Sequence, residues 1–119
     1  PGVQGVPPKK LTVYLAGPMR GKPYYNFLQF DACKVQLEAK GLRVTSPADI
    51  DRSMGFDPFK SMTKNFPKME DCLLRDIEAI TNADAVVLLP GRYTQSTGTM
   101  TEIAAAIFLN KPVYQLPNS

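Results

Sequence analysis

The sequence predicts an α/β fold in which helices cover both faces of a parallel β-sheet. Four short apolar segments alternate with three longer segments whose apolar residues recur at helical spacing, and 119 residues suffice for one domain. Strands that alternate with helices in this way pair in parallel and are joined by right-handed crossovers. We therefore expect a Rossmann-like (flavodoxin-like) parallel sheet of four to five strands.

The order of the elements follows from composition and spacing. The predicted strands are four apolar segments, 11–16, 42–45, 85–89 and 112–116. The predicted helices are three longer segments, 24–40, 68–82 and 98–109. Gly41 and Asn110 follow the first and the last helix, where such residues commonly end a helix.

Two details of this pattern are specific enough to be tested. In the first helix, an apolar stripe of Phe27, Phe30, Val35 and Leu37 is expected to face the sheet. Residues 46–67 contain three prolines and no clear period, so we expect a long connection with a short helix near 57–65. Its apolar side chains are interpreted as a small core of the loop, a subunit contact or a wall beside a bound ring: Met54, Phe56, Phe59, Met62 and Phe66.

The ends of the chain and its cysteines indicate a compartment. Residues 1–10 are rich in Pro and Gly and are interpreted as a disordered or vector-derived segment, with residues 11–119 as a single domain. Cys33 and Cys72 lack CxxC spacing and are expected to be reduced core thiols. With no apolar run of 18 residues and no visible signal peptide, these features predict a cytoplasmic protein that does not bind a membrane.

The composition excludes several kinds of chemistry. The chain has no histidine, so it has no Ser-His-Asp triad, no Cys-His pair and no His-ligated zinc. Acid–base chemistry must come from carboxylates, tyrosine, lysine or cysteine. The net charge is only +3, and no dense basic run with interleaved aromatic residues is present, so we expect no nucleic-acid partner.

One carboxylate lies on an apolar helix face. Asp76 falls between Cys72 and Ile80 at i−4 and i+4, inside the stripe that the second helix should bury. A buried carboxylate costs several kcal/mol unless it is paired or protonated. Asp76 is therefore a candidate catalytic residue, and an aspartate at the edge of the stripe that bonds to a loop amide is the structural alternative.

A second carboxylate is isolated in the last helix. Glu102 is the only charged residue between Arg92 and Lys111, and its neighbours are small or apolar. It lies in the first helical turn, where a carboxylate also complements the helix dipole, a stabilisation of roughly 0.3–1 kcal/mol. Both carboxylates flank the third strand, and Glu102 is expected at the ligand-binding edge of the sheet.

Two loops at the same edge are suited to bind an anion. The segment 93–99 is rich in hydroxyl groups and precedes a helix N-terminus, and the turn at 17–21 contains two glycines and Arg20. No G-x-G-x-x-G or P-loop pattern is present, which disfavours the common dinucleotide and NTP sites. A solvated surface role for Arg20 stays open, and Tyr14 is either a core tyrosine or the partner of a nearby carboxylate.

Four short motifs together resemble the nucleoside 2-deoxyribosyltransferase superfamily over about residues 11–116. They are YLAGPMRG at 14–21, RDIE at 75–78, ADAVV at 83–87, and STG at 96–98 with Glu102 four residues beyond the glycine. The chain looks most similar to the 2′-deoxynucleoside 5′-monophosphate N-glycosidases. Pro18, where these hydrolases often have Ser, and the long connection depart from their pattern. A fainter echo of the PGGxGTxxE loop of cytokinin-type phosphoribohydrolases is interrupted by a seven-residue gap.

The resemblance implies roles for seven residues. Glu102 would be the nucleophile that attacks C1′, Asp76 the acid near the base, and Tyr14 the group that orients the nucleophile. The substrate 5′-phosphate would be held by four residues, Gly17, Arg20, Ser96 and Gly98. No metal and no cofactor are required. The family also implies a homodimer whose second copy closes the site, with Asn118 and Ser119 as candidate contributors.

The expected reaction is hydrolysis of the N-glycosidic bond of a (deoxy)nucleoside 5′-monophosphate, which yields free base and (deoxy)ribose 5-phosphate. Two alternatives stay open. A nucleoside 2-deoxyribosyltransferase would exchange bases on unphosphorylated nucleosides, and a non-catalytic nucleotide-binding module would bind without cleavage. The base and the choice between ribose and deoxyribose are left undetermined by the sequence.

Overall fold

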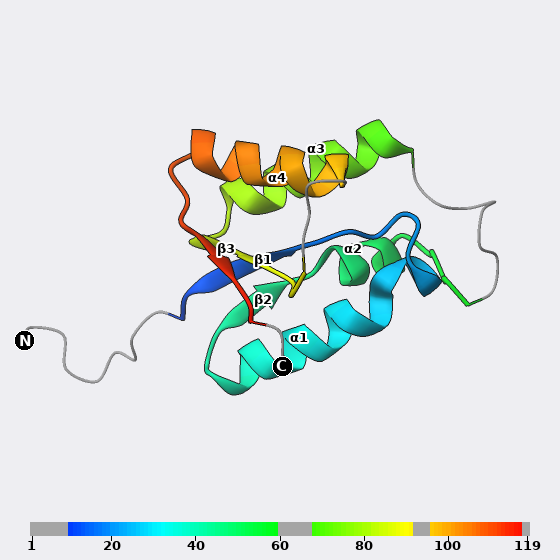
Figure 1. Cartoon of the computed structure of the whole chain (residues 1–119), viewed down its shortest axis with the longest axis horizontal. Coiled ribbons are helices and arrows are strands. Elements are labelled where there is room, and N and C mark those ends of the chain that lie inside the picture. The colour runs from blue at the N-terminus through cyan, green and yellow to red at the C-terminus, as the bar shows by residue number, and fades with distance from the viewer. Residues whose placement is uncertain (1–9, 60–67, 92–95, 118–119) are drawn as a thin grey trace, which may run out of the picture.

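The computed structural model describes residues 10–59, 68–91 and 96–117 (Figure 1). Its elements in chain order are β1 (Thr12–Ala16), the 3-10 turn η1 (Pro23–Asn26), α1 (Phe27–Ala39), β2 (Arg43–Thr45), α2 (Pro47–Ser53), α3 (Met69–Thr81), β3 (Ala85–Leu88), α4 (Thr97–Phe108) and β4 (Val113–Gln115). The interpretation of residues 1–10 lies outside the described part, apart from Lys10.

The four strands form one parallel sheet in the order β2-β1-β3-β4. Tyr14 of β1 pairs with Thr45 of β2 on one side and with Val86 of β3 on the other. Helices α1 and α2 cover one face of the sheet, and α3 and α4 cover the other (Figure 1). The predicted fold class is thus confirmed, with four strands in the described part of the chain.

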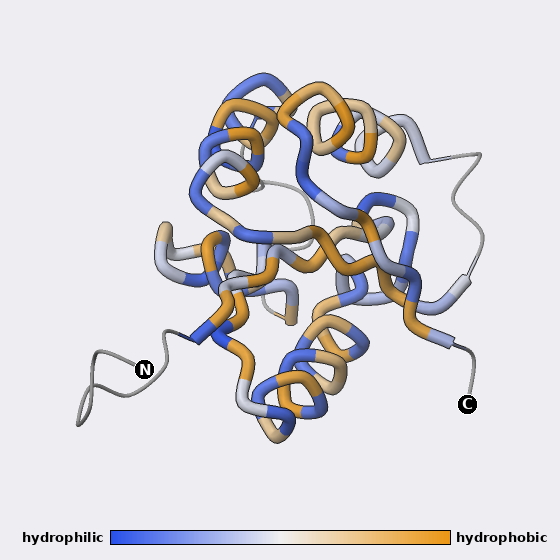
Figure 2. Tube along the Cα trace, turned by 90° about the vertical axis from the view of Figure 1, so that its left-hand side faces the viewer, coloured by the Kyte–Doolittle hydropathy of each residue, from blue (hydrophilic) through white to orange (hydrophobic). Residues whose placement is uncertain are grey.

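The core lies on both faces of the two central strands. Tyr14, Leu15 and Val86 are fully buried, as expected for strands of a parallel sheet that helices cover on both sides. From α1, Phe27 and Phe30 close the core on one face. Figure 2 shows the hydrophobic strands enclosed between the two helical layers.

The structure corrects two of the local predictions. The connection after β2 begins with a short helix, α2, which the sequence analysis did not predict; of the helix predicted near 57–65, residues 57–59 are not helical and residues 60–65 lie outside the described residues. Ser46 caps α2 by accepting a hydrogen bond from Ala48 N (3.3 Å), and Pro47 starts the helix, a favourable combination that the sequence analysis overlooked. Val35 is 66% exposed and outside the buried face of α1, which is completed by Cys33 and Leu37.

The strand order reverses at the centre of the sheet, between β1 and β3. From β1 it crosses to β2 on one side, and it then returns to β3 and β4 on the other side. In open α/β sheets, the loops that leave the carboxyl ends of two such strands diverge and leave a crevice that binds ligands. Here the diverging segments are the loop after β1 and the segment that leads into α4. Among the described helices, none is long and apolar enough to cross a lipid bilayer.

Candidate active site

A cavity of about 380 Å³ opens at this edge of the sheet. Its walls come from the loop after β1, the N-terminal half of α3 and the first turns of α4. Six of the seven predicted site residues line it: Gly17, Arg20, Asp76, Ser96, Gly98 and Glu102. The seventh, Tyr14, lies beneath the cavity in the core. A cavity of this size is typical of a small-molecule site.

Tyr14 and Glu102 meet at the floor of this cavity. The Tyr14 hydroxyl donates a hydrogen bond of 2.6 Å to Oε2 of Glu102. Tyr14 is fully buried and Glu102 is 5% exposed. β1 supplies the tyrosine from the centre of the sheet, and α4 supplies the carboxyl group from its first turns. The hydroxyl thus fixes one oxygen of Glu102 and leaves the other carboxyl oxygen for a different partner.

The surroundings of Glu102 favour its protonated form. Burial raises the pKa of Glu102 well above its usual range, and the negative charge of Asp76 raises it further. The hydrogen bond from Tyr14 lowers this pKa, but burial is the larger effect. The pKa of Tyr14 is also raised well above its usual value, first by burial and then by the charge of Glu102, so the phenol stays a donor.

Asp76 forms a carboxyl pair with Glu102. Asp76 Oδ1 is buried and has no hydrogen-bond partner among the described residues. Side-chain hydrogen bonding between the two groups lowers the pKa of Asp76 and raises the pKa of Glu102, although burial still leaves the pKa of Asp76 above its ordinary value. Two carboxyl groups share a hydrogen bond only when one of them is protonated. A hydrogen bond between them therefore requires one proton, and of the two groups Glu102 has its pKa raised further above the ordinary value.

The N-terminus of α4 forms another wall of the cavity. Ser96 is the N-cap, and its Oγ accepts a hydrogen bond from Thr99 N (3.3 Å) and lies 2.8 Å from Thr99 Oγ1. At Gly98, a Cβ atom would meet no atom of the described residues within 4 Å, so these residues leave the backbone there open to a ligand. A helix N-terminus with this access is suited to bind an anion. The predicted contributions of residues 93–95 lie outside the described residues.

The loop after β1 is held in a defined position. Asn26 Nδ2 donates a hydrogen bond of 2.9 Å to the carbonyl oxygen of Pro18. Arg20 lines the cavity. A Cβ atom on Gly17 would lie 2.6 Å from Leu89 Cδ1, so packing alone explains the need for glycine there. The phosphate-binding role assigned to Gly17 stays a prediction.

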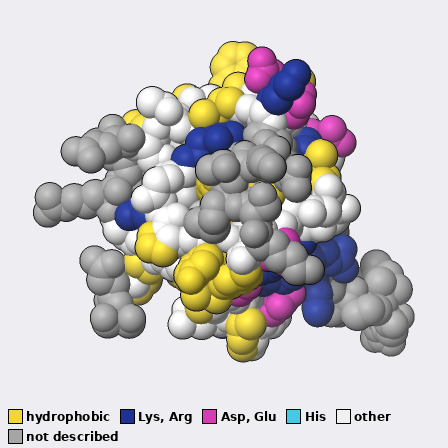
Figure 3. Space-filling model, turned by 90° about the vertical axis from the view of Figure 1, so that its right-hand side faces the viewer, with side chains coloured by type: hydrophobic (Ala, Val, Ile, Leu, Met, Phe, Trp, Pro, Cys, Tyr) yellow, Lys and Arg dark blue, Asp and Glu magenta, His cyan; other side chains and the backbone are white. Residues whose placement is uncertain are grey.

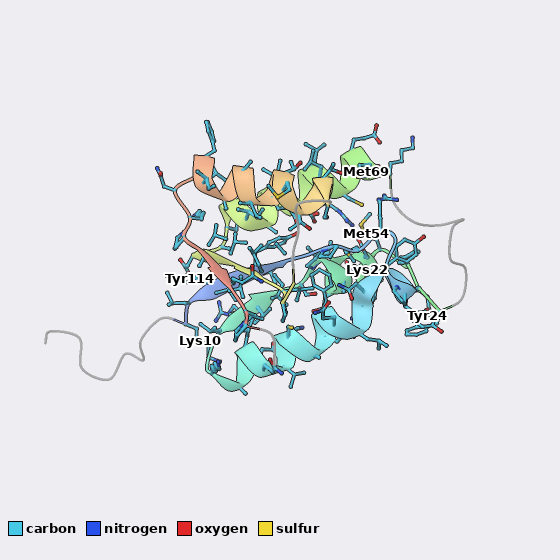
Figure 4. The ribbon with its side chains drawn as sticks, viewed as in Figure 1. Lys10, Lys22, Tyr24, Met54, Met69 and Tyr114 are labelled. Atoms are coloured by element: carbon cyan, nitrogen blue, oxygen red, sulfur yellow. The ribbon has the colours of Figure 1, made fainter. Side chains whose placement is uncertain are left out.

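Several residues that shape the cavity were missed by the sequence analysis. Lys22 and Met69 line it, and Figure 4 shows both at the same end of the molecule as Met54. Figure 3 views that end, where hydrophobic side chains gather beside Lys and Arg side chains. Arg75 lines the cavity too and forms an ion pair of 2.8 Å with Asp51. The cap and proline that start α2 are the feature of the sequence that could have revealed this helix and, with it, the position of Asp51.

The described methionine and aromatic residues of the long connection do not line the cavity. Phe56 is in the core, with its ring edge-on to Tyr25 and Phe27, and neither it nor Met54 nor Phe59 lines the cavity. Met62 and Phe66 lie outside the described residues. The two cysteines are free thiols: Cys33 is buried, and Cys72 is half-buried at the cavity.

The chemistry of the site is that of carboxyl groups. Burial raises the pKa of both thiols, which leaves Cys33 and Cys72 neutral. The described residues contain no group of three or more His, Cys, Asp or Glu side chains that could hold a metal ion. Two neighbouring carboxyl groups and a helix N-terminus are therefore the chemical groups that this cavity combines.

Solved structures with the same architecture include enzymes. A 2-deoxyribosyltransferase from Bacillus psychrosaccharolyticus is 26% identical, with a TM-score of 0.59, and the match covers 87% of this chain and 70% of that chain. BlsM is 26% identical with a TM-score of 0.65, over 90% of this chain and 64% of its own length. The chain thus spans less than two thirds of BlsM.

A third structure, the CMP N-glycosidase BcmB from Clostridium botulinum, is 20% identical and shares the fold, with a TM-score of 0.57 over 89% of this chain and 71% of that chain. These neighbours support the superfamily resemblance of the sequence. No curated protein matches the chain. The family described as "Domain of unknown function (DUF4406)" matches residues 11–115, and the chain therefore belongs to this family.

Proposed function

We propose that this protein hydrolyses the N-glycosidic bond of a (deoxy)nucleoside 5′-monophosphate and releases free base and (deoxy)ribose 5-phosphate. The observation that carries the proposal is the buried Tyr14–Glu102 hydrogen bond of 2.6 Å beside Asp76, at the floor of a cavity with an anion-binding wall. This arrangement offers a nucleophile and an acid for one glycosidic bond.

The pair can supply both groups from its single proton. In the proposed resting state the proton lies on Glu102, whose pKa burial and the charge of Asp76 raise well above the ordinary value. Transfer of this proton to Asp76 turns Glu102 into a carboxylate, which attacks C1′ while Asp76 passes the proton to the departing base. A bond forms between C1′ and a Glu102 oxygen as the bond between C1′ and the base nitrogen breaks. Water then hydrolyses the glycosyl ester, with Asp76 as the base.

We also propose that the N-terminus of α4 and Arg20 bind the 5′-phosphate of the substrate. The α4 N-terminus offers backbone N–H groups at Gly98 and the hydroxyl of Ser96, and Arg20 adds a positive charge to the same cavity. A nucleotide that lies with its phosphate at this wall places C1′ toward Glu102, which is one helical turn further along α4. The proposed phosphate site thus aligns the bond with the carboxyl pair.

The structural neighbours support the reaction class. One is a 2-deoxyribosyltransferase and another a CMP N-glycosidase, and both names denote chemistry at the bond between a sugar and a base. A transferase is the second candidate, because a base in place of water would resolve the same intermediate, and the 26% identity with a transferase favours it. A non-catalytic nucleotide-binding module leaves the buried carboxyl pair without a use.

The proposed function also bears on cofactors, on the oligomeric state and on the location of the protein. The carboxyl pair requires neither a metal nor a cofactor for the reaction described above. A homodimer, whose second copy closes the cavity, and a cytoplasmic location stay predictions. The candidate contributors Asn118 and Ser119 lie outside the described residues.

The proposal is tested by incubation with each common ribo- and deoxyribonucleoside 5′-monophosphate and with the matching nucleosides. Free base is measured by liquid chromatography, and a second base is added in parallel to detect exchange. We expect release from at least one monophosphate, none with the Glu102→Gln variant, and weaker turnover of the matching nucleoside. No release from any substrate by folded protein would overturn the proposal, and exchange indifferent to the phosphate would favour the transferase.

A further inference from the structure

Two hydroxyl groups at the start of α4 are in contact at the cavity wall. The Oγ atom of Ser96 lies 2.8 Å from Oγ1 of Thr99, and it also accepts a hydrogen bond of 3.3 Å from Thr99 N. Both residues line the cavity. Thr99 is 1% exposed, whereas Ser96 is half-buried. The pair thus joins an enclosed residue to one that is open to the cavity.

The Thr99 side chain forms a different bond from the next threonine of the same helix. Threonine hydroxyls in helices commonly donate to a backbone carbonyl oxygen of the preceding turn. Thr101 does so, with a hydrogen bond of 2.7 Å from its Oγ1 to the carbonyl oxygen of Thr97. Among the described residues, the hydroxyl of Thr99 bonds instead to the Oγ atom of the cap residue Ser96.

The burial of Thr99 decides which hydroxyl donates in this contact. If Ser96 donated, the hydrogen of the enclosed Thr99 hydroxyl would have no acceptor among the described residues, which is costly for a buried donor. If Thr99 donates, its hydrogen bonds to Ser96, and the hydrogen of Ser96 is free to point into the cavity. The second arrangement leaves no buried hydrogen unpaired and is therefore favoured.

This arrangement leaves Ser96 with a donor and no free acceptor. A hydroxyl oxygen has two lone pairs that accept hydrogen bonds and one hydrogen that donates. Both lone pairs of Ser96 Oγ are occupied, one by Thr99 N and the other by the Thr99 hydroxyl. Hydrogen bonds in such a chain polarise one another, which strengthens the remaining donor. The ligand group that complements Ser96 is therefore an acceptor.

The neighbouring groups of the wall also donate. The N–H group of Gly98 belongs to the first turn of α4, where backbone donors have no partner within the helix, and Arg20 adds the N–H groups of its guanidinium. The oxygens of an ionised phosphate are strong acceptors. The wall and an ionised phosphate are thus complementary in hydrogen bonding as well as in charge.

We propose that Thr99 is a positioning residue that makes Ser96 a dedicated hydrogen-bond donor to the 5′-phosphate of the substrate. This inference rests on the proposed function, in which the N-terminus of α4 binds that phosphate. Thr99 acts through Ser96, because its own hydroxyl hydrogen is used within the pair. Loss of the Thr99 hydroxyl should therefore weaken the binding of phosphorylated ligands and leave the chemistry at the carboxyl groups unchanged.

The first test measures binding and needs no cleavage. Ribose 5-phosphate and 2-deoxyribose 5-phosphate are the probes, because they carry the phosphate and have no base, and calorimetry gives their affinities. Thr99→Val keeps the shape of the side chain without its hydroxyl, and Thr99→Ser keeps the hydroxyl. We expect Thr99→Val to bind the better probe about tenfold more weakly than the wild type, and Thr99→Ser to bind it nearly as well as the wild type. Unchanged affinity in Thr99→Val overturns the inference.

A double-variant cycle shows whether Thr99 acts through Ser96. In the background of Ser96→Ala, the hydroxyl that Thr99 positions is absent, so Thr99→Val should cause no further loss of affinity. Equal losses in the two backgrounds would mean that Thr99 acts independently, and would overturn the inference. Urea unfolding of each variant checks the fold, since Ser96→Ala also removes a helix cap.

Thr101→Val is the matched control. It makes the same change in the same helix, but Thr101 is exposed, bonds to the backbone of α4 and is not among the residues that line the cavity. The control should bind the probes as the wild type does. A loss as large as that in Thr99→Val would indicate a general effect on the helix and would overturn the inference.

The second test uses the monophosphate that the wild type cleaves and the matching nucleoside. We expect Thr99→Val to raise KM for the monophosphate about tenfold with little change in kcat, and to leave turnover of the nucleoside unchanged. An equal loss for both substrates overturns the inference. A wild type that binds the probes without cleaving any nucleotide counts against the proposed hydrolysis and leaves the binding data to judge Thr99. A wild type that binds neither probe overturns the inference itself.

Discussion

Tyr14 in the central strand and Glu102 in α4 are joined by a hydrogen bond of 2.6 Å between residues that lie 88 positions apart. The bond lowers the pKa of Glu102 against the larger effect of burial. It therefore holds the proposed nucleophile in place and makes its ionised form easier to reach. The first prediction removes this bond.

Tyr14→Phe deletes the donor and keeps the ring. We expect the pKa values of Glu102 and Asp76 both to rise, so that both limbs of the pH–rate profile move to higher pH, and kcat to fall because the ionised nucleophile is harder to reach. Loss of a partner for a buried acceptor should also destabilise the fold by about 1–3 kcal/mol. Urea unfolding and initial rates across pH measure both effects. A variant with the wild-type pH profile would show that the hydroxyl has no influence on the nucleophile.

Glu102→Gln should abolish turnover and change the pH dependence of stability. Because the folded-state pKa of Glu102 is raised above its unfolded value, the protonated group stabilises the fold at low pH. This contribution is lost as pH rises through the folded-state pKa. The variant, which cannot ionise, should gain stability relative to the wild type as pH rises. Melting curves at several pH values test this, with the exposed Glu78→Gln as the control that should follow the wild type.

The proposed phosphate site predicts that loss of Arg20 weakens binding of the nucleotide selectively. Arg20→Gln should raise KM for the monophosphate by removing a positive charge, with a smaller change in kcat and little effect on the matching nucleoside. Inorganic phosphate should inhibit the wild type competitively. Arg43→Gln, an exposed position on β2, is the control expected to behave as the wild type. Equal losses for nucleotide and nucleoside would place the phosphate elsewhere.

The one-proton carboxyl pair predicts a bell-shaped pH–rate profile. Below the acid limb both carboxyl groups are protonated and no nucleophile exists, and above the alkaline limb both are ionised and the base lacks its proton. Because burial raises the pKa values of both Asp76 and Glu102, both limbs should lie above the range of ordinary carboxyl groups. Initial rates over a wide pH range measure the limbs. In Asp76→Asn, we expect slow turnover without the alkaline limb.

Gly17→Ala tests why the first loop begins with glycine. The new methyl group would lie 2.6 Å from Leu89 Cδ1, and Leu89 is fully buried. We expect a loss of about 1–3 kcal/mol in the free energy of unfolding. In the double variant Gly17→Ala/Leu89→Ala the two effects should not add, because the smaller side chain makes room. Strict additivity would mean that the glycine serves the backbone of the loop and not this contact.

The fold was predictable because its pattern is strong and local. The strands at 12–16 and 85–88 are continuous apolar runs, which is the pattern of strands covered on both faces. α2 was missed because it has only seven residues and no apolar period, and its start depends on a cap and a proline. Val35 was assigned to the wrong face because the apolar residues of α1 extend around several sides.

The candidate site was predictable only in part. Asp76 and Glu102 were noticed because charged residues in apolar stretches are costly, and the sheet topology places them at one edge. The ion pair between Asp51 and Arg75 joins segments 24 positions apart and leaves no periodic signal. Lys22 lies after β1, and Met69 is the first residue of α3. Both line the cavity because of the tertiary fold, which the local spacing of residues does not encode.

In the proposed reaction, Glu102 forms a covalent bond with C1′ of the sugar. Its direct measurement is mass spectrometry of protein quenched during reaction with a slow analogue, a 2′-fluoroarabino 5′-monophosphate of the base that the enzyme releases. We predict one added sugar 5-phosphate, located on the peptide that contains Glu102 and absent from Glu102→Gln. A sugar attached to another residue, or a sugar product with inverted configuration at C1′ and no adduct, would show that Glu102 is not the nucleophile.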